Sequence, residues 1–208
     1  MDKKEYLANP TGASALSFWK TCNFNNPVHI KVLNENEFNP SLLETHTDEV
    51  YFKLVHYLED IDEQFKSEEF IFVKASTEEF VNHINYCYEK EGLTYSELES
   101  YKIRPIYDED LWICLYDNIN HAIAATGIAE FDREIKEGYL DWIQISKEYR
   151  GQGLGKAIVY ELLRRLKKKA NFVTVSGRVD NKFKPEKLYE SCGFKSKVLW
   201  HILTEKNQ

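Results

Sequence analysis

The sequence predicts an α/β (α+β) fold, in which a mixed, mostly antiparallel central β-sheet is flanked by helices. Three features lead to this prediction. A turn around Asn118–His121 separates two apolar runs and so predicts an antiparallel hairpin. Tyr139–Ser176 reads as a strand–helix–strand unit, whose two strands should be parallel with a right-handed crossover. From residue 69 onward, strand and helix patterns alternate regularly.

Residues 1–68 differ from the rest of the chain in their residue pattern and show few clear helical patterns. They contain three turn signals, at Asn9–Gly12, Asn25–Pro27 and Asn39–Ser41. Two strands are expected between and after these turns, at Val28–Leu33 and Val50–Leu58. We therefore expect residues 1–68 to be an α+β extension that packs on a core formed by residues 69–208.

The core should begin with a strand at Phe70–Ala75 and a helix that starts at Ser76. A hydroxyl at the cap and the carboxylates of Glu78 and Glu79 in the first turn are typical of a helix N-terminus. The remaining expected elements are a helix at Ser96–Tyr101, strands at Leu111–Tyr116, Ile123–Phe131 and Tyr139–Ile145, a helix at Leu154–Lys169, a strand at Phe172–Ser176, a helix at Pro185–Ser191 and a strand at Val198–Leu203.

Composition narrows the class of protein. The chain has 208 residues and a net charge of −7, which weighs against a nucleic-acid binder. Four scattered cysteines without a CxxC pair, and an N-terminus without an apolar signal segment, indicate a reducing cytoplasm and no membrane anchor. His83, His121 and His201 lack the spacing of metal ligands, so no metal site is expected.

The most informative stretch is Tyr149-Arg150-Gly151-Gln152-Gly153-Leu154-Gly155-Lys156, between a predicted strand and the longest predicted helix. Three glycines in five residues permit a tight turn, and the first turn of a helix offers N–H groups and a positive dipole end. This combination predicts a phosphate or pyrophosphate cradle, whereas the simpler alternative is a plain tight turn. The glycine spacing matches neither a P-loop nor a dinucleotide fingerprint.

This stretch resembles the acetyl-CoA pyrophosphate loop (Q/R-x-x-G-x-G/A) of the GNAT superfamily of N-acetyltransferases. Leu188-Tyr189-Glu190-Ser191-Cys192-Gly193-Phe194 is similar to a second signature of that family, LYExxGF. Both blocks occur in the family's order, and the resemblance covers about residues 69–203. It implies a GNAT fold, in which a parallel strand pair is splayed at the cofactor site.

The resemblance also implies roles for particular residues. Ile143 and Ile145 would offer main-chain groups to the pantetheine arm, and an N–H there would stabilise an oxyanion. Tyr189 would lie near the thioester sulfur and protonate the leaving thiolate, although it can equally be a core aromatic. The residues assigned to the cofactor are Ile143, Ile145, Arg150, Gly151, Gln152, Gly153, Leu154, Gly155, Lys156, Asn181 and Tyr189.

A general base would help to deprotonate an attacking amine. Asp141 is the first candidate, because it is an acid within an apolar strand and shares a face with Ile143 and Ile145 by the period of two. Glu130 is the second candidate, and a plain surface acid is the alternative interpretation of Asp141.

By the same resemblance, residues 86–107 would wall the acceptor cleft; the side chains concerned are Tyr88, Glu91, Tyr95, Tyr101 and Tyr107. Acidic residues between Glu44 and Glu69 would either attract a protonated amine or form a solvated surface; they include Glu59, Asp60, Asp62, Glu63, Glu68 and Glu69. The expected activity is transfer of acetyl from acetyl-CoA to a primary amine of a small molecule or peptide. The alternative is a non-catalytic CoA-binding or protein-interaction module of the same fold. The strands within residues 1–68 would extend the sheet or support a homodimer.

Overall fold

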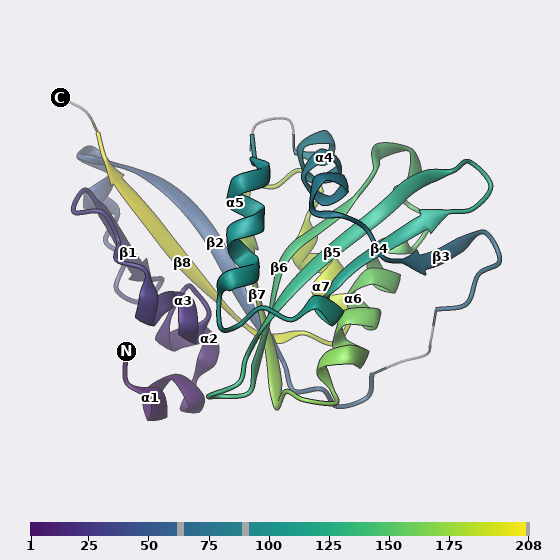
Figure 1. Cartoon of the computed structure of the whole chain (residues 1–208). Coiled ribbons are helices and arrows are strands. Elements are labelled where there is room, and N and C mark those ends of the chain that lie inside the picture. The colour runs from purple at the N-terminus through teal and green to yellow at the C-terminus, as the bar shows by residue number, and fades with distance from the viewer. Residues whose placement is uncertain (62–64, 89–91, 207–208) are drawn as a thin grey trace. The chain divides into compact units, whose positions relative to one another are not determined.

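The computed structural model describes residues 1–61, 65–88 and 92–206, in which several helices or several strands follow one another along the chain (Figure 1). The chain divides into two units. The first comprises residues 1–57 and 174–208, and the second comprises residues 58–173. Each unit is described here by itself.

Four antiparallel strands form the sheet of the second unit. In spatial order they are β6 (Glu137–Ile145), β5 (Ala122–Asp132), β4 (Trp112–Asp117) and β3 (Phe70–Val73). Trp112 of β4 lies opposite Ile128 of β5, and Thr126 of β5 lies opposite Gln144 of β6. The hairpin expected around Asn118–His121 is the connection between β4 and β5.

Helices cover both faces of this sheet (Figure 1). Ile128 packs in one cluster with Phe80 and Ile84 of α4 (Thr77–Cys87) and with Leu98 of α5 (Tyr95–Glu99). Its neighbour Gly127 faces the other way, because a Cβ there would lie 2.6 Å from Ile158 Cγ2 of α6 (Leu154–Leu166). Successive strand residues point to opposite faces, so α4 and α6 lie on opposite sides of β5.

Short 3₁₀ segments connect these elements, and two of the helices begin with capping boxes. The connections are η2 (Ser100–Ile103), η3 (Glu109–Leu111) and η4 (Lys147–Tyr149). Ser76 and Glu79 cap α4 reciprocally, and Thr94 and Glu97 do the same for α5. The helix start expected at Ser76 is therefore confirmed.

The first unit is built on three antiparallel strands. β8 (Lys195–Glu205) runs between β1 (Ile30–Asn34) and β2 (His46–His56), with Ile30 opposite Thr204 and Phe52 opposite Leu199. β7 (Phe172–Arg178) begins in the second unit and continues in the first, where it follows β2 in the strand order. α7 (Pro185–Ser191) has the bounds that the sequence predicts.

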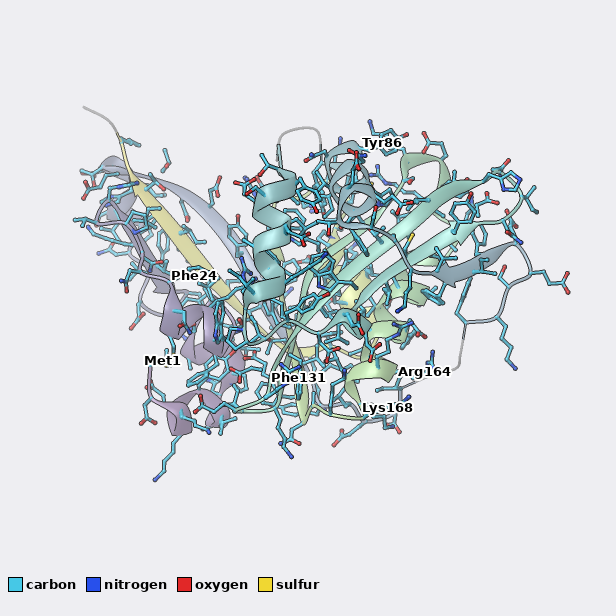
Figure 2. The ribbon with its side chains drawn as sticks, in the orientation of Figure 1. Met1, Phe24, Tyr86, Phe131, Arg164 and Lys168 are labelled. Carbon is cyan, nitrogen blue, oxygen red and sulfur yellow. The ribbon has the colours of Figure 1, made fainter. Side chains whose placement is uncertain are left out.

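Three short N-terminal helices were not predicted: α1 (Lys3–Ala8), α2 (Pro10–Ala13) and α3 (Phe18–Asn23); a 3₁₀ turn, η1 (Pro40–Glu44), follows later in the unit. None of the three helices exceeds six residues, so none can repeat an apolar stripe over several turns. Met1 and Phe24 project from this segment and are each 49% exposed (Figure 2).

A buried lysine links these helices to β2. Lys53 is fully buried, and its Nζ donates hydrogen bonds to the Tyr6 hydroxyl at 3.0 Å and to the Ser14 carbonyl at 2.9 Å. Its Nζ also lies 4.8 Å from the centre of the Tyr6 ring. The charge of Lys53 is thus stabilised by oxygen acceptors and an aromatic face from the first 16 residues.

The fold class predicted from the sequence is confirmed: a mixed sheet with one parallel pair among antiparallel pairs, flanked by helices. All four cysteines are free thiols, and Cys114 and Cys192 are buried. Over the described residues, no helix combines the length and apolar character that a membrane crossing needs.

Candidate functional site

The glycine loop adopts a backbone that favours glycine at two positions. Gly151 has a φ of +80° and Gly153, the N-cap of α6, has a φ of +81°. Side chains rarely adopt this left-handed conformation. A Cβ built on either residue would meet no protein atom within 4 Å. The glycines are therefore required by the turn, and the space in front of them is open.

The N-terminus of α6 opens directly from this loop. The N-cap of α6 is Gly153, which has no side chain to cap the first turn of the helix. The helix is 13 residues long, so its first N–H groups and dipole present a positive end beside Gly153. Arg150 and Lys156 add charge there. These features fit an anion such as a pyrophosphate.

Main-chain carbonyls of β6 face away from β5 at the two residues assigned to pantetheine. The Tyr88 hydroxyl donates to the Ile143 carbonyl at 3.2 Å, and Arg150 Nε donates to the Ile145 carbonyl at 3.2 Å. Ser146 N, by contrast, donates to Ala124 O of β5 at 3.0 Å. The N–H and C=O of one strand residue point the same way, so Ile143 and Ile145 also direct their N–H groups away from β5.

Asp141 occupies a β-bulge, which the sequence did not reveal. Ile128 lies opposite Trp142, and Ala129 lies opposite Leu140, so Asp141 has no opposite residue on β5. A bulge breaks the alternation of side chains. The face-sharing argument for Asp141 therefore does not hold at this residue, although bulges often lie beside active sites.

Glu130, the second candidate base, is held in an ion pair. Its Oε1 lies 2.8 Å from Arg104 Nη1, and its side chain is only 4% exposed. The Arg104 guanidinium also lies 3.4 Å from the centre of the Tyr101 ring. The Arg104 guanidinium thus engages one oxygen of the Glu130 carboxylate within the fold.

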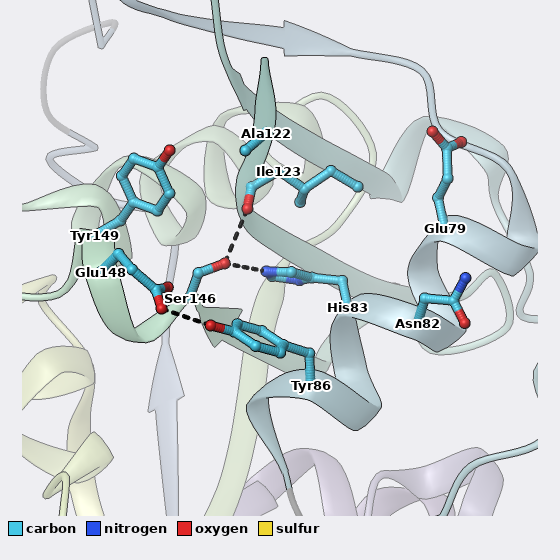
Figure 3. A pocket seen from close by; sticks show the side chains of 9 residues that line it. All are labelled: Glu79, Asn82, His83, Tyr86, Ala122, Ile123, Ser146, Glu148 and Tyr149. Atoms are coloured by element: carbon cyan, nitrogen blue, oxygen red, sulfur yellow. Dashed lines mark hydrogen bonds between the residues drawn. The ribbon is translucent and has the colours of Figure 1, made fainter. Parts of the chain in front are cut away.

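Three side-chain contacts hold residues 146–149, the segment between β6 and the glycine loop; Figure 3 shows two of them, His83 with Ser146 and Tyr86 with Glu148. His83 Nε2 lies 2.8 Å from Ser146 Oγ, and the Tyr86 hydroxyl donates to Glu148 Oε1 at 2.6 Å. The Tyr149 hydroxyl donates to Asp117 Oδ2 at 2.8 Å. A cavity of about 440 Å³ lies among these side chains, with Ala122 and Ile123 on its wall.

Burial and hydrogen bonds shift the pKa values of His83, Glu148 and Asp117. Burial lowers the pKa of His83 to about 4, so its imidazole is neutral at pH 7. The hydrogen bond from Tyr86 holds the pKa of Glu148 below its usual range. Burial raises the pKa of Asp117, but hydrogen bonds from Asn120, Tyr149 and Ile119 outweigh it and bring the pKa to about 2.

Cysteine chemistry is not favoured at the site. Cys87 Sγ lies 3.7 Å from His83 Nε2, and burial raises the pKa of this thiol to about 11. Burial likewise raises the pKa of Cys114 to about 12. Because the thiolate is the nucleophile, neither residue is activated near pH 7.

Tyr189 and Asn181 belong to the first unit, whereas the glycine loop and β6 belong to the second. Tyr189 is 6% exposed, with its ring centre 6.3 Å from that of Phe52 and 5.6 Å from that of Phe194. Asn181 Oδ1 accepts from the Phe183 N–H at 3.0 Å, which closes a turn ahead of α7.

The residues expected to wall the acceptor cleft have varied environments. Tyr107 packs edge-on against Trp112 at 5.6 Å, and Tyr95 is 54% exposed. Glu91, also expected in this wall, lies outside the described residues. So do Asp62 and Glu63, two of the acids expected to attract a protonated amine. Glu59, Asp60 and Glu68 are exposed.

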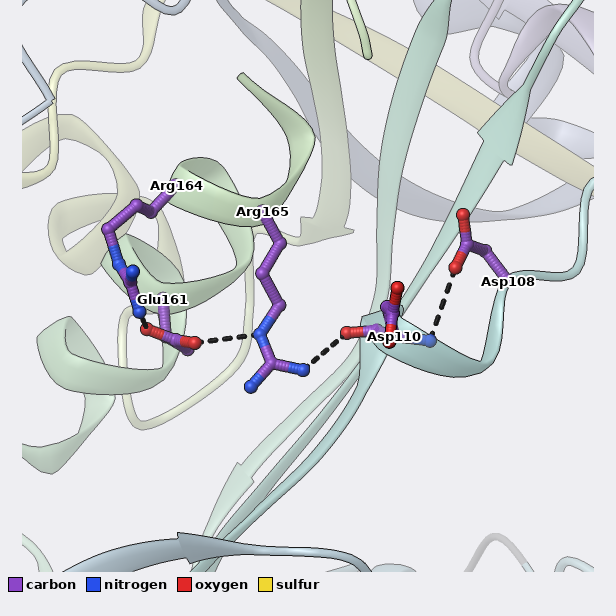
Figure 4. Close-up of polar contacts among 5 residues, drawn as sticks. All are labelled: Asp108, Asp110, Glu161, Arg164 and Arg165. Carbon is purple, nitrogen blue, oxygen red and sulfur yellow. Dashed lines mark hydrogen bonds and ion pairs between the residues drawn. The ribbon is translucent and has the colours of Figure 1, made fainter. Parts of the chain in front are cut away.

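A run of basic residues, Arg164–Lys169, covers the end of α6, and its two arginines form ion pairs within the helix. Glu161 accepts hydrogen bonds from Arg164 and from Arg165, whose Nη1 also donates to the Asp110 carbonyl at 2.6 Å (Figure 4). Arg164 and Lys168 lie at the end of the helix (Figure 2). The ion pairs and the position of these basic side chains near the negative end of the α6 dipole give the run a structural role.

His83, Asp117 and Ser146 escaped the sequence analysis as site residues, and Tyr86 entered it only as the first residue of the expected acceptor wall. His83 was considered there only as a metal ligand. No local signal marks these positions, because each contact joins residues at least 32 positions apart.

Comparisons with known proteins bear on the family and the fold of the chain. A family model described as "Acetyltransferase (GNAT) family" matches residues 35–194. No curated protein sequence matches the chain. Many solved structures do, among them a GCN5-related N-acetyltransferase from Sphaerobacter thermophilus, with a TM-score of 0.67 and 12% identity over 86% of this chain and 60% of that one.

Two further solved structures share the fold. A conserved protein of unknown function from Staphylococcus epidermidis has a TM-score of 0.59 and 15% identity, covering 86% of this chain and 73% of that one. The ribosomal-protein-S18-alanine N-acetyltransferase from Escherichia coli has a TM-score of 0.52 and 16% identity, covering 67% of this chain and 96% of that one.

Identities this low support the fold alone, and the chain spans less than two thirds of the Sphaerobacter protein. The family match is broader evidence, because it covers most of the chain, from β2 through the glycine loop to Phe194. From the sequence signatures, the fold and this match together, the chain belongs to the GNAT family of acetyltransferases.

Proposed function

We propose that the protein is an acetyl-CoA-dependent N-acetyltransferase, which acetylates a primary amine of a small molecule or peptide by direct attack on the thioester. The observation that carries the proposal is the open glycine loop at the uncapped N-terminus of α6. This loop is an anion site in a chain of the GNAT family.

The residues present fit the cofactor. Backbone N–H groups of the loop from Gly151 to Lys156, together with Arg150, would hold the pyrophosphate. Outward-facing main-chain groups of Ile143 and Ile145 would bind the pantetheine amides. Asn181 would contribute from the loop before α7. Acetyl-CoA supplies an activated acetyl group when bound.

Proton transfers would fall to two side chains. A primary amine is mostly protonated at pH 7, so a carboxylate near the acceptor assists its deprotonation. Asp141, at the β6 bulge, is our candidate for this base. The ion pair with Arg104 makes Glu130 less suited to the role. Tyr189 would donate a proton to the departing thiolate.

A second candidate is a non-catalytic CoA-binding or protein-interaction module. The burial of Tyr189 against Phe52 and Phe194 favours it, because a core role alone would account for that residue. We also propose that the protein acts in the cytoplasm as a homodimer, without nucleic-acid or membrane partners. The net charge of −7 supports the absence of a nucleic-acid partner, the free thiols support a reducing compartment, and light scattering tests the dimer.

Thermal unfolding with acetyl-CoA tests the proposal first. If the dissociation constant is about 10 μM, 1 mM ligand adds about 2.7 kcal/mol, which raises the melting temperature by roughly 5–10 °C. Thiol release with a panel of primary amines then separates the two candidates. Binding without release for any amine favours the module, and no shift at millimolar acetyl-CoA contradicts both.

A further inference from the structure

The cavity in Figure 3 has a buried histidine on its wall, hydrogen-bonded at both ring nitrogens. His83 Nδ1 lies 2.9 Å from Thr126 Oγ1, and His83 Nε2 lies 2.8 Å from Ser146 Oγ. The exposed fractions are 6% for His83, 0% for Thr126 and 3% for Ser146. The three side chains come from α4, from β5 and from the residue that follows β6.

The outer partners of the two hydroxyls fix the direction of every bond. Ser146 Oγ donates to the Ile123 carbonyl at 2.9 Å, so it accepts from His83 Nε2–H. A neutral ring with its proton on Nε2 has only a lone pair at Nδ1, so Thr126 Oγ1, which accepts from Gln144 Nε2, donates its own hydrogen to His83 Nδ1. A single tautomer, neutral and protonated at Nε2, satisfies the whole chain.

Ser146 is the point from which the glycine loop departs. Its N–H makes the last backbone bond from this strand to β5, and its carbonyl accepts from Tyr149 N at 3.0 Å. Beyond it, the chain turns through η4 and reaches Gly151. A shift of Ser146 would therefore move the start of the loop.

We infer that His83 is a positioning residue, which as the Nε2–H tautomer clamps Ser146 and so holds the glycine loop in its binding geometry. The inference deepens the proposed function and rests on it for the effect on the cofactor. His83 does not contact the loop itself, and it acts through Ser146.

Substitution tests the clamp. His83→Leu removes both bonds, whereas His83→Gln keeps an amide that can donate to Ser146 Oγ. The matched control is Thr77→Val, which removes a buried hydroxyl bond to Glu99 at the other end of α4. We expect CoA affinity, measured by calorimetry, to fall about 10-fold in His83→Leu. It should stay within about 3-fold of wild type in His83→Gln and in Thr77→Val.

Two readouts do not depend on CoA. Exchange of the Ser146 and Tyr149 amides should be about 10-fold faster in His83→Leu than in Thr77→Val. Long-range ¹H–¹⁵N spectra of the wild type should show the Nε2–H tautomer at pH 7. The Nδ1–H tautomer, or loop exchange and CoA affinity unchanged in His83→Leu, would overturn the inference. If His83→Leu does not fold, Ser146→Ala carries the same expectations. A wild type that shows the clamp but binds no CoA would reject the proposed function alone.

Discussion

Gly153 combines two requirements at one residue: a left-handed backbone and open space for a ligand. Gly92 also has a positive φ, +58°, and no atom within 4 Å of a built Cβ, but it lies between α4 and α5. Substitution of Gly92 therefore reports backbone strain alone, whereas substitution of Gly153 reports backbone strain together with any loss of ligand contact.

Gly153→Ala should lower the free energy of unfolding by about 1 kcal/mol and abolish measurable acetyl-CoA binding. Gly92→Ala should carry the same strain without any change in affinity. Urea unfolding and calorimetry measure the two effects. Wild-type affinity in Gly153→Ala would show that the pyrophosphate does not bind at this loop.

Tyr189 is buried against Phe52 and Phe194, so Tyr189→Phe keeps the packing and removes only the hydroxyl. If the hydroxyl donates a proton to the thiolate, kcat should fall about 10-fold or more while the dissociation constant of acetyl-CoA stays unchanged. Steady-state thiol release and calorimetry separate the two. An unchanged kcat would remove Tyr189 from the acid role.

His83 gives the protein a specific acid sensitivity. Its pKa is about 4 in the folded state and about 6.5 in the unfolded chain. As pH falls from about 6.5 to about 4, the unfolded state binds a proton that the folded state does not. The free energy of unfolding should therefore decrease across this window, by about 3 kcal/mol in all.

Denaturant unfolding of wild type and His83→Gln from pH 7 to pH 4 measures this effect as a difference. Other titratable groups around the cavity and the ring include Glu79, Tyr86, Cys87, Glu148 and Tyr149, which both proteins share. The hydrogen bond from Tyr86 holds the pKa of Glu148 below its usual range, and this pair of residues is common to both proteins. Parallel pH profiles for the two proteins would contradict the prediction.

At the scale of elements, β5 has to accommodate α6 closely. Gly127 allows this approach, because a Cβ there would lie 2.6 Å from Ile158 Cγ2 and 3.1 Å from Leu162 Cδ1. The same contact sets the distance of the α6 N-terminus from the sheet. The helix α6 therefore both packs on Gly127 of β5 and begins at the glycine loop, so a change in its packing would also move the loop.

Gly127→Ala should lower the free energy of unfolding by about 1–3 kcal/mol, because α6 or its side chains must give way. Adding Ile158→Leu removes the clashing Cγ2 methyl and should restore part of the loss. Urea unfolding of the single and double variants tests the argument. Additive losses in the double variant would place the strain elsewhere.

At the scale of the whole molecule, the chain ends and the N-terminal segment share one unit. Residues 1–57 supply both antiparallel neighbours of β8, and Phe52 of this segment packs against Tyr189. The sequence predicts a boundary near residue 68, with residues 69–208 as the core, and this boundary stays a prediction.

Removal of residues 1–57 should therefore leave β8 with unpaired edges, and the shortened protein should aggregate. Size-exclusion chromatography with light scattering compares it with the full chain. A soluble fragment that binds acetyl-CoA with full affinity would instead support residues 1–68 as a dispensable extension.

The sequence by itself determined the features that depend on neighbouring residues. The glycine loop, the helix after it, the hairpin around Asn118–His121 and the capping box at Ser76 are all local patterns, because turn and cap preferences act within a few residues. These patterns in order also sufficed for the fold class and the family.

Only the tertiary structure decided the features that depend on contacts between distant segments. They include the bulge at Asp141, the Arg104–Glu130 ion pair, the burial of Lys53 and the clamp of His83 on Ser146. The bulge needs the register of a partner strand, and burial and pairing need the full packing of the chain. His83 and Ser146 are 63 positions apart and meet through one hydrogen bond, so no repeating pattern in the sequence predicts their contact.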